Sequence, residues 1–130
     1  MAKIALYPAI FQKEETGYFV KFPDLEGCVT QGESIEESIM KAHEVLAFYL
    51  DDFDLNNLPQ ASDITKIEIL DDSFPSIISV DMLEYRKKHK NKAVKKTLSI
   101  PQWLNEIALK ENLNFSQILQ DAIIEKLKLQ

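Results

Sequence analysis

The first eighty residues alternate between short apolar segments and polar turns, a pattern typical of a small sheet. Five segments rich in β-forming side chains predict strands at residues 4–11, 18–22, 28–32, 66–70 and 77–82. Pro8 restricts the first strand to an edge or an irregular position. Apolar residues recur at helical spacing over residues 35–51, directly after a capping box made by Ser34 and Glu37. The order β-β-β-α-β-β predicts an α+β fold, a small antiparallel sheet with one covering helix.

The last 37 residues follow a different pattern, one strand and then two helices. In residues 94–100, apolar and polar side chains alternate, which predicts a short amphipathic strand. Pro101 suits the first turn of a helix, and Asn114 opens a second helix with Gln117 three residues later. A lone strand has two open edges, and fewer than about 40 residues seldom build an independent core. We therefore expect two copies to pair their strands antiparallel and to share a core of four helices.

The charge is divided in the same way as the pattern. Residues 1–84 carry 5 basic and 17 acidic side chains, a net −12, whereas residues 85–130 carry 10 and 4, a net +6. Seven basic residues and no acidic ones lie between Arg86 and Lys96. Such a run is either a solvated linker or a nucleic-acid footprint, and the predicted two-stranded ribbon, which fits the major groove of DNA, favours the second. We predict domains at 1–84 and 94–130, joined by a basic linker at 85–93.

Several classes of protein are excluded at this stage. No apolar run approaches the roughly 20 residues of a membrane-spanning helix, and the N-terminus has no signal-peptide pattern. The single cysteine, Cys28, excludes an internal disulfide and a multi-thiolate zinc site. These features predict a cytoplasmic protein.

Two segments resemble known families. Residues 94–128 are similar to the ribbon-helix-helix repressors, the class of Arc and MetJ. Residues 5–52 resemble the N-terminal domain of the HicB antitoxins, above all in the stretch from Phe22 to Gly32, with shorter matches at Tyr7–Phe11 and Gly17–Val20.

The resemblance implies an antitoxin of a HicAB toxin–antitoxin system. Its first domain, similar to a truncated ribonuclease H fold, is expected to bind and block a HicA-type toxin, a small ribonuclease. Its second domain is expected to bind operator DNA as a homodimer or tetramer, and so to repress the chain's own operon.

The same resemblance implies the site residues. In the ribbon, the side chains facing away from the core are expected to contact bases, and the amides at the start of the last helix are expected to hold a phosphate. The predicted DNA-binding residues are Lys92, Lys95, Lys96, Thr97, Ser99, Phe115 and Ser116. Ser99 departs from many family members, which carry arginine there. The predicted toxin-binding residues are Phe22, Pro23, Asp24, Leu25 and Glu26. We predict no catalytic residue, metal or cofactor.

Two other functions stay open. A ribonuclease H-like fold raises the question of nuclease activity, which requires several carboxylates around two metal ions about 4 Å apart. The acidic residues here lie mostly in predicted turns, caps and helix ends, so we favour an acidic surface that attracts a basic partner. The other open function is that of a transcriptional regulator whose acidic domain senses a small ligand. Finding a neighbouring reading frame for a small basic protein would favour the antitoxin.

A few conspicuous side chains are predicted to be structural. We expect His43 to be half-buried, His89 to lie on the surface and Cys28 to be a packed core residue. The aromatic residues Tyr18, Phe19, Phe22 and Phe48 are also expected in the core. Trp103 is left open between the core of the dimer and its edge.

Overall fold

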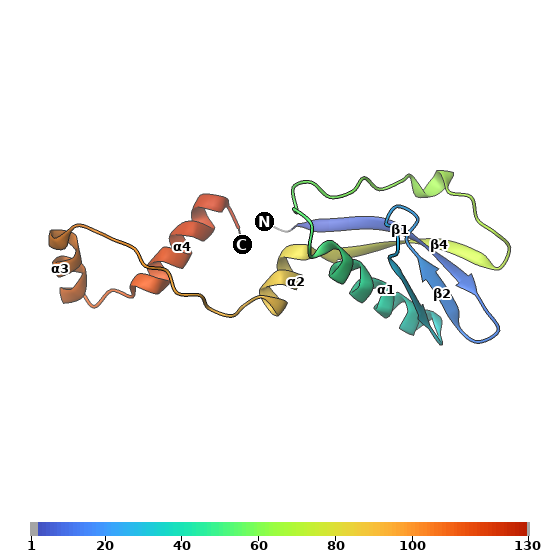
Figure 1. Ribbon diagram of the computed structural model, residues 1–130, viewed down its shortest axis with the longest axis horizontal. Coiled ribbons are helices and arrows are strands. Elements are labelled where there is room, and N and C mark those ends of the chain that lie inside the picture. Colours follow the sequence, from blue (N-terminus) through green and yellow to red (C-terminus); the bar gives the residue numbers. More distant parts are fainter. Residues whose placement is uncertain (1–2, 130) are drawn as a thin grey trace. The chain divides into compact units, whose positions relative to one another are not determined.

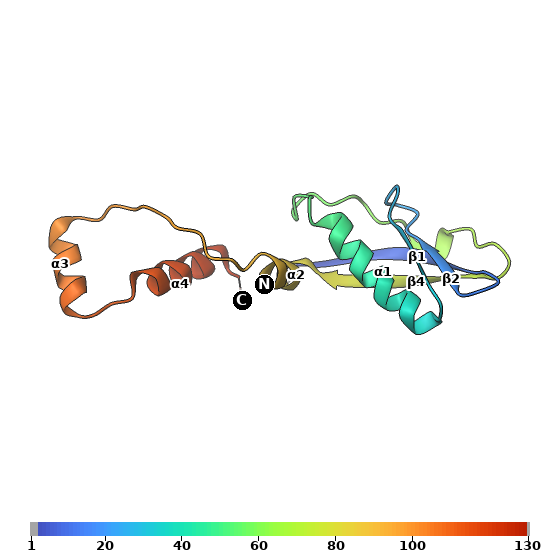
Figure 2. The ribbon, with the colours of Figure 1, turned by 60° about the horizontal axis from the view of Figure 1, so that its bottom comes forward.

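The computed structural model describes residues 3–129, which form two compact units, Lys3–Lys90 and residues 91–129 (Figure 1). The first unit holds an antiparallel sheet with the strand order β3-β2-β1-β4. Its strands are β1 (Ile4–Lys13), β2 (Tyr18–Lys21), β3 (Val29–Gly32) and β4 (Ser73–Asp81). The helix α1 (Ile35–Leu50) lies across one face of this sheet, as Figure 2 shows. The predicted α+β class, with a small antiparallel sheet and a covering helix, is confirmed.

The core of this unit lies between α1 and the sheet. Alternate residues of β1 point toward the helix because side chains along a strand alternate between its two faces. The central core residues are Ala5, Tyr7, Ala9, Phe11, Val20, Ala42, Leu46, Leu50 and Ile78. The rings of Phe11, in β1, and Phe74, in the neighbouring strand β4, stack with their centroids 5.1 Å apart.

The predicted N-terminus of α1 is also confirmed. The Ser34 hydroxyl accepts a hydrogen bond of 3.1 Å from the Glu37 amide, and the Glu37 carboxylate accepts one from the Glu33 amide. These contacts satisfy amide groups that the first turn of a helix leaves without partners.

Both prolines of the sheet occupy positions where the missing N–H is not needed. Ser79 directs its carbonyl away from β1 and toward His43 Nδ1, 2.7 Å away. The backbone N–H and C=O groups of every second residue of β4, counted from Ser79, therefore point to the open edge of the sheet. Pro75 is one of these residues, so no strand needs its missing N–H. Pro8 faces away from β4, at a level of β1 that β2 does not reach. β1 is an inner strand and runs regularly through Pro8, but its edge is free at that level, so the edge alternative predicted for Pro8 holds locally and the irregular one does not.

Two of the predicted strands differ from the structure. Residues 66–70 form no strand; a 3-10 helix, η1 (Ile64–Lys66), is followed by irregular chain up to β4. The alternation of apolar and charged side chains from Ile67 onward favoured a strand there, but no neighbouring strand pairs with it. The strand predicted at 77–82 is part of β4, which begins four residues earlier, and Met82 already belongs to a helix.

That helix, α2 (Met82–His89), occupies the first half of the predicted linker. The Asp81 carboxylate accepts hydrogen bonds of 3.1 Å from the Leu83 amide and 3.2 Å from the Glu84 amide, so it caps the helix. The first compact unit therefore ends at Lys90, six residues beyond the boundary predicted from the sequence.

The second unit contains two helices, α3 (Gln102–Lys110) and α4 (Phe115–Leu127), as predicted. Asn112 has a φ of 54° and ends α3 in a left-handed turn. The turn is closed by hydrogen bonds from Asn112 N to Leu109 O and from Leu113 N to Ala108 O, the pattern of a Schellman motif. Residues 91–100 contain no helix or strand in this single chain.

Candidate functional site

The helices of the second unit carry many large apolar side chains that a single chain leaves exposed. Ala108, with 5% of its surface exposed, is the one buried residue between positions 91 and 129. The exposed large apolar residues of the two helices and their connection are Trp103, Leu104, Ile107, Leu109, Leu113, Phe115, Ile118, Ile123, Ile124 and Leu127. Apolar patches of this extent are rare on soluble monomers and mark surfaces that another surface covers.

The segment before these helices holds most of the predicted DNA-binding residues. Every residue from position 91 to position 103 is exposed, and the ones with candidate roles are Lys92, Lys95, Lys96, Thr97 and Ser99. The structure thus leaves all five side chains accessible. The strand predicted for residues 94–100 requires a second strand for its hydrogen bonds, and it stays a prediction.

The start of α4 has the chemistry of an anion site. The side chain of Asn114 accepts a hydrogen bond of 3.0 Å from the amide of Gln117, the third residue of the helix. Within residues 3–129, the amides of Phe115 and Ser116 make no hydrogen bond. Free amides at a helix N-terminus suit a phosphate group. The predicted capping box is half formed, because the Gln117 side chain turns to Asp121 Oδ1, 2.9 Å away.

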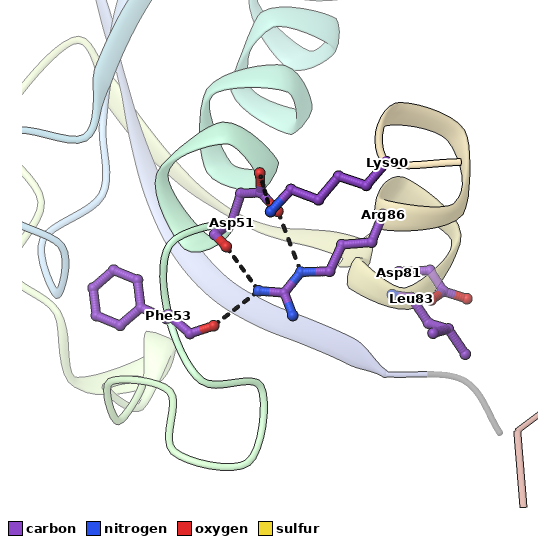
Figure 3. A network of polar contacts seen from close by, with 6 residues as sticks. All are labelled: Asp51, Phe53, Asp81, Leu83, Arg86 and Lys90. Atoms are coloured by element: carbon purple, nitrogen blue, oxygen red, sulfur yellow. Dashed lines mark hydrogen bonds and ion pairs between the residues drawn. The ribbon is translucent and has the colours of Figure 1, made fainter. Parts of the chain in front are cut away.

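The basic run from Arg86 to Lys96 is split between the two units. Arg86 and Lys90 form ion pairs of 3.2 and 3.3 Å with the Asp51 carboxylate (Figure 3), and Lys87 forms one of 3.2 Å with Glu84. These three basic side chains therefore interact with the acidic unit. The net charge becomes −8 for residues 1–90, with 9 basic and 17 acidic side chains, and +2 for residues 91–130, with 6 and 4. The separation of charge is real but smaller than the sequence division at residue 84 indicates.

The Arg86 guanidinium also holds α2 against the end of α1. Besides the ion pair, it donates hydrogen bonds of 2.7 Å to the Asp51 carbonyl and 2.9 Å to the Phe53 carbonyl (Figure 3). α1 has no basic residue in its own last turn, so Arg86 supplies the positive charge that the C-terminal end of a helix favours.

The predicted toxin-binding segment is a tight turn, and two of its five residues belong to the core. Phe22 and Leu25 are each 2% exposed, which leaves no surface for a partner to contact. Asp24 is half-buried and accepts hydrogen bonds from the amide and the hydroxyl of Ser62. Pro23 and Glu26 are exposed. At most three of the five side chains are accessible to a partner, and one of them, Asp24, is already hydrogen-bonded to Ser62.

The predictions for individual side chains have mixed outcomes. His43 is half-buried, His89 is exposed, and Cys28 is buried, as expected. Burial raises the pKa of the Cys28 thiol to about 11, which disfavours the reactive thiolate. The prediction for Phe48 was wrong, because its side chain is 73% exposed on the outer side of α1.

Phe48 belongs to a surface that the sequence prediction missed. With Glu36, Met40 and Glu44 it follows a four-residue spacing along α1, and all four side chains are exposed. Residues four apart on a helix share a face, so the spacing could have revealed this row. Because Phe48 is a large aromatic residue, it was assigned to the core instead.

Two further features limit the chemistry. Among residues 3–129, no group of three or more His, Cys, Asp or Glu side chains is arranged to hold a metal ion. None of the helices in that range is long and apolar enough to cross a membrane.

Comparison with known proteins reveals relatives that match less than half of this chain. A UPF0150 protein of Helicobacter pylori is 42% identical over 53 residues, which are 41% of this chain and 74% of that protein. The antitoxin HicB 2 of Photorhabdus laumondii is 38% identical over 56 residues, 40% of each chain. An uncharacterised protein of Haemophilus phage HP1 is 33% identical over 61 residues, and the match spans 46% of its length. The chain thus matches less than half of the length of the last two proteins.

Solved structures match almost the whole chain. A chain of a toxin–antitoxin complex from Streptococcus pneumoniae is 35% identical, with a TM-score of 0.60, and the match covers 95% of this chain and 99% of that one. The antitoxin HicB of Burkholderia pseudomallei shares the fold, with a TM-score of 0.52, 21% identity and coverage of 95% and 98%.

The family model of the HicB-like antitoxins of bacterial toxin–antitoxin systems matches residues 7–122, a range that covers most of each unit. The helices α1, α2 and α3 and the strands β2, β3 and β4 lie wholly within the matched range, which also covers most of β1 and the first part of α4. The chain belongs to the HicB-like antitoxin family.

Proposed function

We propose that this antitoxin binds and blocks a small HicA-type ribonuclease through its first unit and represses its own operon through its second. The observation that carries the proposal is that one chain contains two units with different surfaces, one acidic and one with exposed apolar helices. An ordered unit with a net charge of −8 is joined to a helix pair that exposes its apolar residues and is preceded by lysines. We assign no catalytic role to the chain.

Charge supports toxin binding by the first unit. A ribonuclease must attract RNA phosphates, so its active site needs a cationic surround. An acidic partner is steered toward such a surface at long range and opposes it with the complementary charge. The similarity to a chain of a toxin–antitoxin complex supports a protein partner of this kind.

The exposed helices support DNA binding by a dimer of the second unit. A second copy would cover the apolar residues of α3 and α4, and would provide the strand that residues 94–100 need. Lys95, Thr97 and Ser99 would then lie on the polar face of a two-stranded ribbon, which fits the major groove. The free amides of Phe115 and Ser116 would hold the flanking phosphates.

The toxin part is tested by searching the genomic neighbourhood for a reading frame that encodes a small basic protein, and by expressing that protein with the full chain. We expect growth arrest when that protein is expressed alone, normal growth with both, and a stable complex on purification. If the chain neither binds the basic protein nor restores growth, the toxin part of the proposal fails.

The DNA part is tested by titrating the full chain with its own promoter DNA and with random DNA. Thr97→Ala should weaken promoter binding by roughly 1–3 kcal/mol and leave random DNA nearly unaffected, because Thr97 would contact a base. Lys92→Ala should weaken both and reduce their salt dependence, because Lys92 would contact a phosphate. Equal losses on both DNAs for Thr97→Ala would contradict the proposed position of the ribbon.

A further inference from the structure

The outer row of α1 is the most unusual exposed surface of the first unit. It alternates acidic and large apolar side chains in the order Glu36, Met40, Glu44 and Phe48. Met40 is 64% exposed and Phe48 is 73% exposed. Within residues 3–129, the carboxylates of Glu36 and Glu44 have no hydrogen bond or ion pair. The fold does not need this row, because α1 packs on the sheet through the opposite row, with Ala42, Leu46 and Leu50.

A groove of about 700 Å³ adjoins the C-terminal end of this row. Its lining residues come from β3, α1 and α2: Thr30, Lys41, Glu44, Val45, Phe48, Tyr85 and His89. The Tyr85 and His89 rings lie against each other with their centroids 4.3 Å apart. Lys41, the basic side chain of α1, forms an ion pair of 3.4 Å with Glu37. The groove thus combines aromatic rings with an unpaired carboxylate, a combination that attracts a cationic side chain.

The α2 side of the groove is fixed in place. Arg86 follows Tyr85 directly and binds Asp51 and the Phe53 carbonyl at the end of α1 (Figure 3). This anchoring holds Tyr85 and His89 beside α1 before any partner arrives. A preformed surface binds with a smaller loss of conformational entropy than one that must be ordered on binding.

We infer that the outer row of α1 and its groove form the docking surface for the basic toxin, and this inference rests on the proposed function. Phe48 is the apolar anchor of the interface, and Glu36 and Glu44 pair with basic side chains of the toxin. Aromatic residues, Phe among them, are enriched at protein interfaces, and a few anchor residues usually carry most of the binding energy. The docking surface therefore lies mainly on α1 and not on the segment from Phe22 to Glu26, where two side chains are buried.

The test compares two substitutions in the docking surface with two matched controls elsewhere in the first unit, all in the full chain. Phe48→Ala is matched by Leu70→Ala, since Leu70 is 70% exposed and lies in the connection before β4. Glu44→Lys is matched by Glu68→Lys, an equal change of charge at another exposed position. The probe is the small basic protein identified in the test of the proposed function, and its affinity is measured by calorimetry. Association rates are measured at low and high salt.

Phe48→Ala should weaken binding by about 30-fold or more, as the loss of an aromatic anchor does. Glu44→Lys should slow association by about tenfold at low salt, and the effect should shrink at high salt because ions screen exposed charges. Both controls should stay within about threefold of the unsubstituted chain. An unchanged melting temperature for Phe48→Ala would show that the loss comes from the interface.

The outcomes separate this inference from the proposed function. If the unsubstituted chain does not bind the basic protein, the proposed function fails, and the inference with it. If it binds, and Phe48→Ala and Glu44→Lys bind equally well, only the docking surface is overturned. The docking surface is likewise overturned if these substitutions change the mass of the free chain in sedimentation and not its affinity for the toxin, since a second copy would then occupy the row.

Discussion

At the scale of single residues, Arg86 is the side chain that links α2 to the end of α1. Arg86 and Asp51 are 29% and 20% exposed, and the guanidinium makes three hydrogen bonds across two segments. Arg86→Ala should lower the free energy of unfolding by about 1–3 kcal/mol, because partly buried acceptors lose a charged donor. Lys87→Ala, at a more exposed ion pair, should cost less than about 1 kcal/mol. Chemical denaturation of the full chain measures both, and equal losses would contradict the role of Arg86.

Two glycines offer a matched test of backbone geometry. Gly17 and Gly27 have φ values of 83° and 79°, a region that costs other residues roughly 1–2 kcal/mol. A Cβ at Gly27 would meet open space, whereas one at Gly17 would lie 2.2 Å from the Gly32 carbonyl oxygen. Gly17→Ala should therefore destabilise the chain clearly more than Gly27→Ala in thermal melting. Similar losses would mean that β3 moves away from the turn at little cost.

The Cys28 thiol provides a test by pH. Burial raises its pKa from 9.0 to about 11, so the folded chain keeps its proton at pH values where the unfolded chain releases it. The folded state consequently loses stability as the pH rises from about 9 toward 11, and Cys28→Ala should flatten this part of the pH profile. Iodoacetamide at pH 8 should label Cys28 far more slowly in the native chain than in denaturant. Equal labelling rates would show that the thiol is accessible.

At the scale of elements, the sequence predicts best where a local signal and the tertiary environment agree. α1 has a capping serine, acidic residues in its first turn and an apolar stripe that the sheet buries, so its bounds were predicted within a residue. The start of β4 was missed because Ser73 to Ser76, with Pro75 between them, resembles a turn. Only the position of β4 at the edge of the sheet makes a proline acceptable there.

α2 was missed for a related reason. Its residues are highly charged and weakly amphipathic, and the Asp81 cap stands at the end of what was predicted as a strand. Arg86 also ties it to Asp51 and Phe53, some thirty residues earlier in the sequence, and such a contact leaves no local signature. The outer row of α1 was missed because a large aromatic residue such as Phe48 is usually buried, although the four-residue spacing of the row is visible in the sequence.

Limited proteolysis tests where the ordered part of the first unit ends. Trypsin should cleave the full chain after Lys92 before it cleaves after Arg86 or Lys87, because α2 is helical and Arg86 is anchored to Asp51. Mass spectrometry of early fragments identifies the first cut. In the Arg86→Ala variant, cleavage within α2 should become faster. Early cleavage after Arg86 in the unsubstituted chain would contradict the anchoring.

At the scale of the whole molecule, the exposed apolar residues of α3 and α4 predict the state of assembly. The full chain should sediment with at least twice the mass of one chain at micromolar concentration, since two copies are needed to cover these residues. Replacing Leu104 and Ile118 with Asp should give a monomer that keeps the first unit folded, because neither residue belongs to it. The melting of the second unit should depend on concentration in the unsubstituted chain. A folded monomer would contradict the proposed ribbon.

The ion pairs of Asp51 have a consequence for how this antitoxin is dissected. A fragment cut at residue 84, where the charge changes sign in the sequence, would contain the acceptors at Asp51 and Phe53 but lack the guanidinium of Arg86 and the ammonium of Lys90. It would also end before most of α2, and it would lose Tyr85 and His89 from the groove. A failure of that fragment to neutralise a toxin would therefore not test the role of the first unit, whereas a fragment ending at Lys90 retains every one of these groups.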